Sequence, residues 1–244
     1  MASELITCTI NDGLCAIALN RPDKLNALQF ETIKQLGESL DRIEFEEVGC
    51  VLLTGNGRSF CAGLDLDDLA AGNKRGDVKE FDSNVVERLA NLPVPVVAAV
   101  RGHCYTGGLE LVLSADIVLT TDTARFADTH AKWDLVPIWG MTQRLPRRIG
   151  RQKATEMMFS SRTYSGVEAA AMGLANYSFP EDTFDAEVRR MCDDILGNSR
   201  RSIRAIKKLL LDTEGMRLGE GIAWESHRGE GHGPDFEARL AAMR

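Results

Sequence analysis

The sequence predicts an α/β fold. Two continuous apolar runs, residues 48–54 and 96–100, have the length of strands and the composition of strands that are covered on both faces. Each run is followed by a glycine-rich loop and then by residues whose apolar side chains can open a helix. Because this order of strand, loop and helix recurs along the chain, we expect a core in which strands and helices alternate.

The first half of the chain is expected to start with a hairpin, because the turn sequence Asn11-Asp12-Gly13 separates two strand-like segments. A helix follows, since apolar residues recur at helical spacing between residues 28 and 43. The expected elements are strands over 5–10 and 14–19, a helix over 28–43, a strand over 48–54, a short helix from 64 to 72, a helix over 78–89 and a strand over 96–100.

Helices are expected to dominate from Gly140 onward. Ser165 and Glu168 have the spacing of a capping box, which predicts a helix start at that point. The expected elements are a helix over 109–113, strands over 117–120 and 124–127, a short helix to 172, a strand within 174–179, and helices over 183–196, 200–211 and 218–227. The last two helices carry more charge, so we divide the chain into a core, 1–196, and a helical C-terminal subdomain, 197–244. The Lys207-Lys208 pair is interpreted as a solvated face of one of these helices.

Composition excludes several classes of function. The 244 residues are 44% hydrophobic and 27% charged, as in soluble globular proteins. The formal charge of -7 argues against a nucleic-acid coat or a binder of anionic membranes, because both need a basic face. The longest apolar run, 94–100, is too short for a membrane helix, and the N-terminus lacks a signal-peptide pattern, so a cytoplasmic location is expected. The six cysteines and four histidines show no metal-binding spacing, and no metal is expected.

Two glycine-rich loops, residues 54–66 and 101–111, are the strongest candidates for chemistry. Each follows an apolar strand and ends where a helix begins, and the first N–H groups of a helix are unpaired. Two such helix starts facing each other would direct two N–H donors at one negatively charged oxygen, which is an oxyanion hole. The alternative is that the glycines only permit tight turns. Neither loop matches a phosphate-binding Walker loop or a dinucleotide fingerprint.

A series of further motifs surrounds these loops. They are Arg21-Pro22 with Asn26-Ala27-Leu28, residues 93–102, Ser114-Ala115-Asp116-Ile117, Phe126-Ala127-Asp128, residues 140–146 and residues 169–174. In this order and spacing the series resembles the crotonase superfamily of acyl-CoA enzymes, which includes enoyl-CoA hydratases and isomerases. The resemblance is dense over about residues 5–180 and loose over the C-terminal helices.

The resemblance implies a spiral of ββα units with a helical C-terminal region that forms trimers, often paired into hexamers. It implies that the N–H groups of Leu64 and Gly107 form the oxyanion hole for a thioester carbonyl and stabilise an enolate. An acyl-CoA thioester would be the substrate, without a separate cofactor. The residues whose positions match the family's CoA contacts are Lys24, Leu25, Ala27, Ala62, Asp65 and Leu66. Lys24 could also belong to a merely solvated basic pair with Arg21.

Acid–base chemistry is expected at two positions. Glu110, three residues after Gly107, matches the first glutamate of hydratases, and nearly one helical turn lets its carboxylate face the same site. At the second position hydratases have Phe-x-x-Pro-Glu, whereas this chain has His130. Imidazole can accept or donate a proton, so His130 can take this role, or it can be a hydrogen-bonded wall residue. Asp128 and Asp134 are close by, with their directions open.

The leading expectation is an enoyl-CoA hydratase that uses Glu110 and His130 as acid and base. The alternatives are an enoyl-CoA isomerase that uses one shuttling base, a carbon–carbon bond hydrolase, and a catalytically silent acyl-CoA-binding protein. The turn at 136–140 carries no acid, which counts against decarboxylase and dehalogenase variants. Trp139 stands where the family has a small residue and is expected to narrow the acyl pocket. Residues 229–244 depart from the usual family ending.

Overall fold

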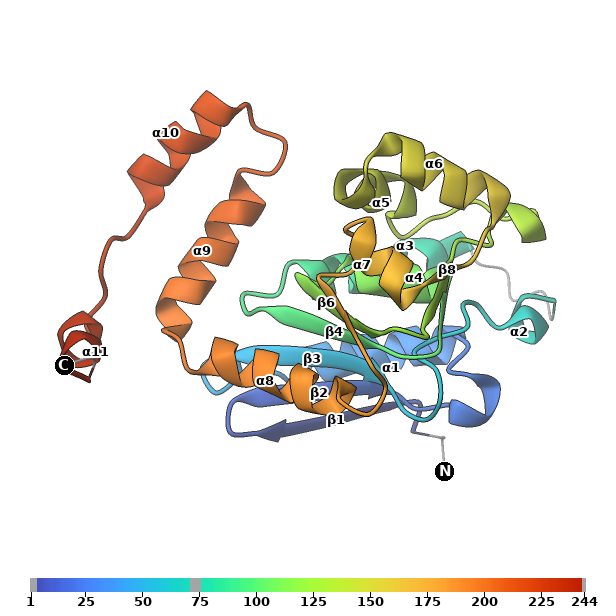
Figure 1. The fold of residues 1–244 in the computed structure, drawn as a ribbon, viewed down its shortest axis with the longest axis horizontal. Coiled ribbons are helices and arrows are strands. Elements are labelled where there is room, and N and C mark those ends of the chain that lie inside the picture. The colour runs from blue at the N-terminus through green and yellow to red at the C-terminus, as the bar shows by residue number, and fades with distance from the viewer. Residues whose placement is uncertain (1–3, 71–75, 243–244) are drawn as a thin grey trace.

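A six-stranded sheet forms the centre of the computed structural model, which describes residues 4–70 and 76–242 (Figure 1). The strands, in spatial order, are β1 (Ile6–Asn11), β2 (Leu14–Leu19), β3 (Cys50–Gly55), β4 (Val96–Val100), β6 (Ile117–Thr121) and β9 (Tyr177–Phe179). The first two pair antiparallel, which confirms the predicted hairpin, and all later neighbours pair parallel. The carboxyl ends of the parallel strands therefore meet at one edge of the sheet.

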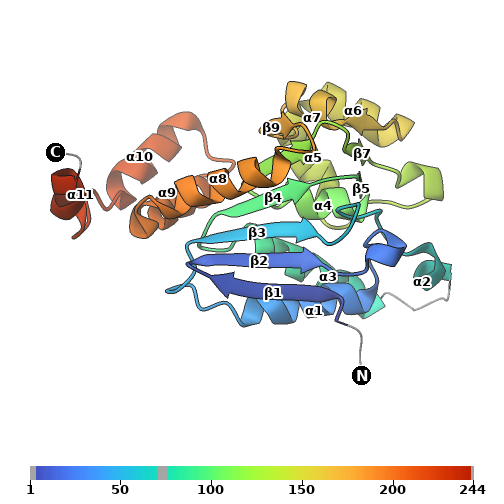
Figure 2. The ribbon, with the colours of Figure 1, turned by 60° about the horizontal axis from the view of Figure 1, so that its bottom comes forward.

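Strand β4 shows why its sequence is continuously apolar. Val96, Ala98 and Val100 pack into the larger hydrophobic core, whereas Val97 and Ala99 pack into a second core on the other face. The larger core receives the buried faces of α1 (Phe30–Asp41) and α3 (Gly76–Ala90), and the second receives α8 (Phe184–Leu196). Figure 2 shows α1 and α3 together on one side of the sheet and α8 on the other.

A smaller three-stranded sheet lies next to the glycine-rich loops. Its strands are β5 (His103–Tyr105), β7 (Arg125–Ala127) and β8 (Tyr164–Ser165). Strand β7 was predicted, but β5 lies inside a segment expected to be loop, and β8 was not expected. Both are two or three residues long and depend on pairing with β7, so the local sequence carries little signal for them.

The remaining core helices are short. They are α2 (Leu66–Ala70), α4 (Gly107–Leu113), α5 (Met141–Ile149), α6 (Arg151–Ser160) and α7 (Gly166–Ala171), with 3₁₀ turns η1 (Pro22–Lys24) and η2 (Ala131–Trp133). The predicted capping box is confirmed, because Ser165 Oγ accepts from the Glu168 N–H and Glu168 accepts from the Ser165 N–H. The expected end of the helix near Gly72 lies outside the described residues. Among the described helices, none is both long and apolar enough to cross a membrane.

Three C-terminal helices extend away from the sheet (Figure 1): α9 (Arg200–Asp212), α10 (Leu218–Arg228) and α11 (Phe236–Ala242). Neither α10 nor α11 buries a residue. The division at residue 197 falls in the turn between α8 and α9, and the existence of two separate units stays a prediction.

Helix α9 is attached to the core through a buried lysine. Lys207 Nζ lies 2.7 Å from Asp116 Oδ2 and donates to the Val94 carbonyl at 3.0 Å. Lys208 points outward and pairs with Asp212. The interpretation of both lysines as a solvated face is therefore wrong for Lys207, because one helical step of about 100° separates the two side chains.

We expect Lys207→Ala to lower the free energy of unfolding by about 2 kcal/mol, because it removes a buried ammonium with hydrogen bonds to Asp116 and to the Val94 carbonyl. The matched control is Lys208→Ala, whose ion pair is exposed and should change stability by less than about 1 kcal/mol. Urea unfolding of both variants at one protein concentration measures the difference. Equal losses in the two variants would contradict the anchoring role of Lys207.

Candidate active site

The first glycine-rich loop is held by Asn26. This side chain is buried; its Nδ2 donates to the carbonyls of Ser59 at 2.8 Å and Asn56 at 3.0 Å, and its Oδ1 accepts from the Arg21 N–H. The Arg21 guanidinium in turn pairs with the carboxylate of Asp65 at the end of the loop. The hydrogen bonds and the ion pair from segment 21–28 therefore fix the conformation of the first glycine-rich loop.

The two glycine-rich loops lie in direct contact. Cys61 donates its N–H to the His103 carbonyl at 2.8 Å and accepts from the Tyr105 N–H at 3.0 Å. A Cβ on Gly108 would stand 2.6 Å from Cys61 Cβ, so only glycine allows this approach. The contact brings the start of α4 next to the end of the first loop, as the sequence predicts.

The two N–H groups expected in the oxyanion hole lie at the ends of these loops. Leu28 bonds through its own N–H and carbonyl to Gly63 and Asp65, which leaves the N–H of Leu64 on the side away from Leu28. Gly107 is the first residue of α4, and its neighbour Thr106 provides no side-chain cap. A first-turn N–H has no partner within its helix and is available to a ligand.

A cavity of about 200 Å³ opens beside this junction. It is lined by Ala62, Leu64, Leu66, Tyr105, Thr106, Thr129, Lys132, Trp133 and Leu135. Three of the predicted site residues, Ala62, Leu64 and Leu66, are thus found together. The hydroxyls of Thr106 and Thr129 lie 2.6 Å apart in its wall and join the two loops that border it.

Glu110 lies in the first turn of α4 and is only 2% exposed. Its Oε1 accepts from the backbone N–H groups of Trp139 at 2.9 Å and Met141 at 3.2 Å. Burial raises the pKa of the Glu110 carboxyl above its ordinary value; the His130 ring and the two N–H donors oppose this rise without cancelling it. Its Oε2 is left facing His130.

His130 connects two buried carboxylates. Its Nδ1 lies 2.6 Å from Asp128 Oδ1, which also accepts from the His130 backbone N–H at 3.1 Å. Its Nε2 lies 3.7 Å from Glu110 Oε2. The two predicted acid–base residues are therefore adjacent, and all three side chains are at most 5% exposed.

Asp128 is a site residue that the sequence analysis left undecided. Its position two residues before His130 indicated that it could take part. The direction of its side chain could not be predicted from this spacing, because the segment is neither helix nor strand. In the structure a carboxylate acceptor at Nδ1 fixes the imidazole with its Nδ1–H toward Asp128 and its Nε2 toward Glu110. Asp134, the other open candidate, is exposed at the end of η2.

The six predicted CoA-binding residues lie along two paired segments. Ala62 donates to the Leu25 carbonyl at 2.9 Å, and Ala27 is adjacent to Leu28 in the bridge to Leu64. Lys24 is half-exposed and lies 3.7 Å from Asp67.

The carboxylate of Asp65 stabilises the end of the first glycine-rich loop. Burial alone would raise its pKa, but the hydrogen bonds from Arg21 and from the N–H groups of Asp67 and Asp68 outweigh burial and lower it. Its carboxylate is therefore occupied within the fold, as is the Arg21 guanidinium.

His103 belongs to the loop contact and does not reach the acid–base cluster through any described hydrogen bond. Its Nδ1 lies 3.0 Å from Ser59 Oγ, and burial, with Arg125 and Arg58 nearby, lowers its pKa. Among the described residues there is no group of three side chains able to hold a metal ion.

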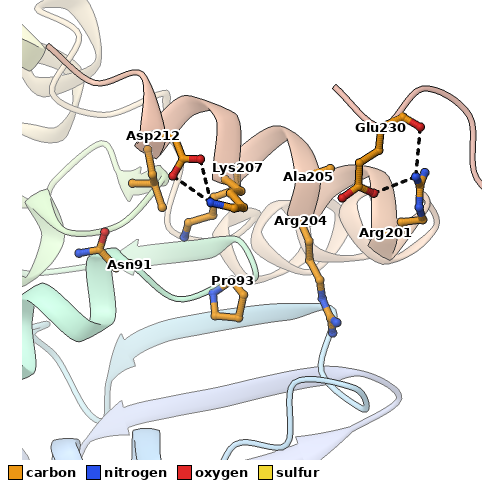
Figure 3. Close-up of a pocket in the computed structure, with 10 residues that line it drawn as sticks. Asn91, Pro93, Arg201, Arg204, Ala205, Lys207, Asp212 and Glu230 are labelled. Atoms are coloured by element: carbon orange, nitrogen blue, oxygen red, sulfur yellow. Dashed lines mark hydrogen bonds and ion pairs between the residues drawn. The ribbon is translucent and has the colours of Figure 1, made fainter. Parts of the chain in front are cut away.

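A larger cavity of about 570 Å³ lies between α9 and the turn before β4, near Pro93 (Figure 3). The four cations that line it are engaged in the fold. Arg201 pairs with Glu230, Lys208 with Asp212 and Lys207 with Asp116, and Arg204 donates to the Val48 carbonyl. It contains neither the acid–base cluster nor the glycine-rich loops.

A family model described as enoyl-CoA hydratase/isomerase matches residues 9–229. The chain belongs to this family. The match confirms the crotonase resemblance that the loop motifs indicated.

The relatives of this enoyl-CoA hydratase/isomerase family member are named for more than one activity. A probable peroxisomal enoyl-CoA hydratase 1 of Arabidopsis thaliana is 33% identical, over 88% of this chain and 82% of that protein. The 1,2-epoxyphenylacetyl-CoA isomerase of Escherichia coli K12 is 32% identical, over 86% of each chain. Family membership thus establishes a crotonase-type acyl-CoA enzyme, and the choice of reaction depends on the site.

Solved structures of family members confirm the fold. An enoyl-CoA hydratase from Bacillus anthracis superposes with a TM-score of 0.93 at 29% identity, covering 98% of this chain and 96% of that one. A putative enoyl-CoA hydratase from Thermobifida fusca, solved in complex with acetoacetyl-CoA, superposes with a TM-score of 0.86 at 27% identity, covering 98% and 95%. The expected crotonase-like architecture is therefore confirmed.

Proposed function

We propose that this protein is an enoyl-CoA hydratase, which adds water reversibly to a 2-enoyl-CoA. The observation that carries the proposal is the buried pair of Glu110 and His130 next to two converging glycine-rich loops. Hydration needs one group to take a proton from water and a second group to protonate the α-carbon, and this pair supplies both.

The N–H groups of Leu64 and Gly107 are proposed to bind the thioester carbonyl oxygen. Negative charge accumulates on this oxygen when water adds to the β-carbon, and the enolate is the intermediate. A fixed donor of this kind is worth about 3 kcal/mol in the transition state. The converging loops support this role, because each places one N–H beside the same junction.

In the hydration direction, Glu110 Oε2 takes a proton from water while the water oxygen bonds to the β-carbon. The imidazolium Nε2–H of His130 then protonates the α-carbon as the enolate collapses to the thioester. The proton on Glu110 returns to His130 across the 3.7 Å between them, which resets the site. Asp128 supports the cationic form of His130 as a counter-charge at Nδ1.

The CoA portion is proposed to lie along the paired segments that hold Lys24, Leu25, Ala27, Ala62 and Leu66, with Asp65 contributing through the loop that it shapes. No separate cofactor is required by this chemistry. We also propose assembly into trimers or hexamers through the C-terminal helices, because α9 and α10 expose large apolar side chains. These are Ile206, Leu210, Leu218 and Ile222, each more than half exposed.

The test is turnover of crotonyl-CoA, followed by loss of the enoyl-thioester absorbance and by identification of the product. We expect 3-hydroxybutyryl-CoA. A 3-enoyl-CoA and a β-diketone, tested in parallel, identify isomerase and carbon–carbon hydrolase activity. Conversion of one of those two substrates without conversion of crotonyl-CoA would overturn the hydratase proposal. Tight binding of CoA esters without turnover of a panel of acyl groups would instead show a silent binding protein.

A further inference from the structure

Trp139 occupies the space beside the proposed oxyanion residue. Its Cζ3 atom lies 2.9 Å from the point where a Cβ on Gly107 would stand, so the ring packs directly on that glycine. Its side chain is buried at 2% exposure, and its backbone N–H donates to Glu110 Oε1. The indole therefore lies next to both the start of α4 and the proposed base.

The open space at the site ends before this indole. The 200 Å³ cavity reaches Leu64, Thr106 and Thr129, but Glu110, His130 and Trp139 do not line it. Ordinary ligand pockets measure about 300–1,000 Å³. A thioester whose carbonyl is bound by Gly107 has its acyl group close to the indole, because the ring packs directly on Gly107.

We propose, resting on the proposed hydratase function, that Trp139 is the end wall of the acyl pocket and restricts the substrate to short-chain acyl-CoA thioesters. The wall acts through bulk. The Cζ3 edge faces Gly107, which puts Nε1 on the opposite edge of the ring, and Nε1 has no hydrogen-bond partner among the residues that the structure describes. Replacing Trp139 by Phe, Leu or Ala thus removes no hydrogen bond and makes the side chain smaller in that order.

Glu110 stays positioned in all these variants, because its partner is the backbone N–H of residue 139 rather than the indole. The change in chain-length preference can therefore be separated from a change in the chemistry. Side-chain truncation is expected to reduce turnover of crotonyl-CoA somewhat, through looser packing around Gly107, and to raise the relative efficiency on longer acyl groups.

The experiment measures binding of butyryl-, octanoyl- and hexadecanoyl-CoA by calorimetry, since saturated esters bind without reacting. Wild type should bind butyryl-CoA at least tenfold more tightly than hexadecanoyl-CoA. Trp139→Leu should shift this ratio at least tenfold toward the longer ester, and Trp139→Phe should lie between the two. The control is Phe159→Ala, an exposed aromatic on α6, which should keep the wild-type ratio. The same series measured as kcat/KM on 2-enoyl-CoA esters should show the same order.

The outcomes separate the two proposals. Equal affinity of wild type for all three esters overturns the end wall while leaving the hydratase proposal intact. Failure of every ester to bind overturns both. Thermal melting checks that Trp139→Leu is folded; if it is not, the wild-type and Trp139→Phe profiles decide, because a wild type without a short-chain preference is sufficient to reject the wall.

Discussion

Glu110→Gln should lower kcat/KM for crotonyl-CoA hydration by about 10³- to 10⁴-fold, because the amide cannot take the proton from water. The shape of the site should persist, since a Gln Oε1 can still accept from the N–H groups of Trp139 and Met141. Steady-state kinetics measure the effect. The matched control is Glu38→Gln, an exposed glutamate on α1, which should stay within about twofold of wild type.

The pH dependence gives a second readout for Glu110. Activity requires the ionised carboxylate, and burial raises the pKa of this group, so kcat/KM should fall with decreasing pH at a higher pH than an ordinary glutamate would give. This acidic limb should disappear in the Gln variant. Because the folded-state pKa lies above the unfolded value, the ionised form costs stability at neutral pH, and Glu110→Gln should unfold at the same or higher urea concentration. A destabilised variant would show that the activity loss is structural.

Asp128→Asn is expected to lower kcat by about 100-fold with little change in KM, because Asp128 acts through His130 and does not touch the substrate. The amide keeps the volume of the side chain but removes the negative charge at Nδ1. His130 then loses the charged partner that orients its ring, and proton transfer at Nε2 slows. Steady-state kinetics on crotonyl-CoA measure kcat and KM separately, and a rise in KM with unchanged kcat would contradict this positioning role.

Asp134→Asn is the matched control for Asp128. Asp134 lies six residues later in the same segment, is exposed, and has a positive φ of 54° that asparagine tolerates. It should retain wild-type kcat and KM. If His130→Ala and Asp128→Asn both keep full activity while Glu110→Gln does not, a single base is sufficient, and the isomerase assay with a 3-enoyl-CoA is the next measurement.

Some features could be predicted from the sequence because they depend on neighbours along the chain. The continuous apolar runs that form β3 and β4 predict strands that are buried on both faces, because a polar side chain on either face would lose its contact with water. The capping box at Ser165 is likewise local, because its two hydrogen bonds join residues three apart. The proximity of Glu110 to Gly107 follows from helical geometry alone, because the two residues are three apart in α4.

Other features depend on contacts between distant segments. Strand β5 exists because it pairs with β7 about twenty residues later. Lys207 is buried because its ammonium contacts Asp116. Its neighbour Lys208 has the same side chain but is exposed and pairs with Asp212.

The sequence by itself determined the fold class, the two glycine-rich loops and the candidates Glu110 and His130. Only the tertiary structure decided that Asp128 lies behind His130 and that the Trp139 indole lies on Gly107. The physical reason is the irregular backbone of residues 128–140. Without helix or strand periodicity, spacing along the chain does not fix the direction of a side chain, and packing against α4 does.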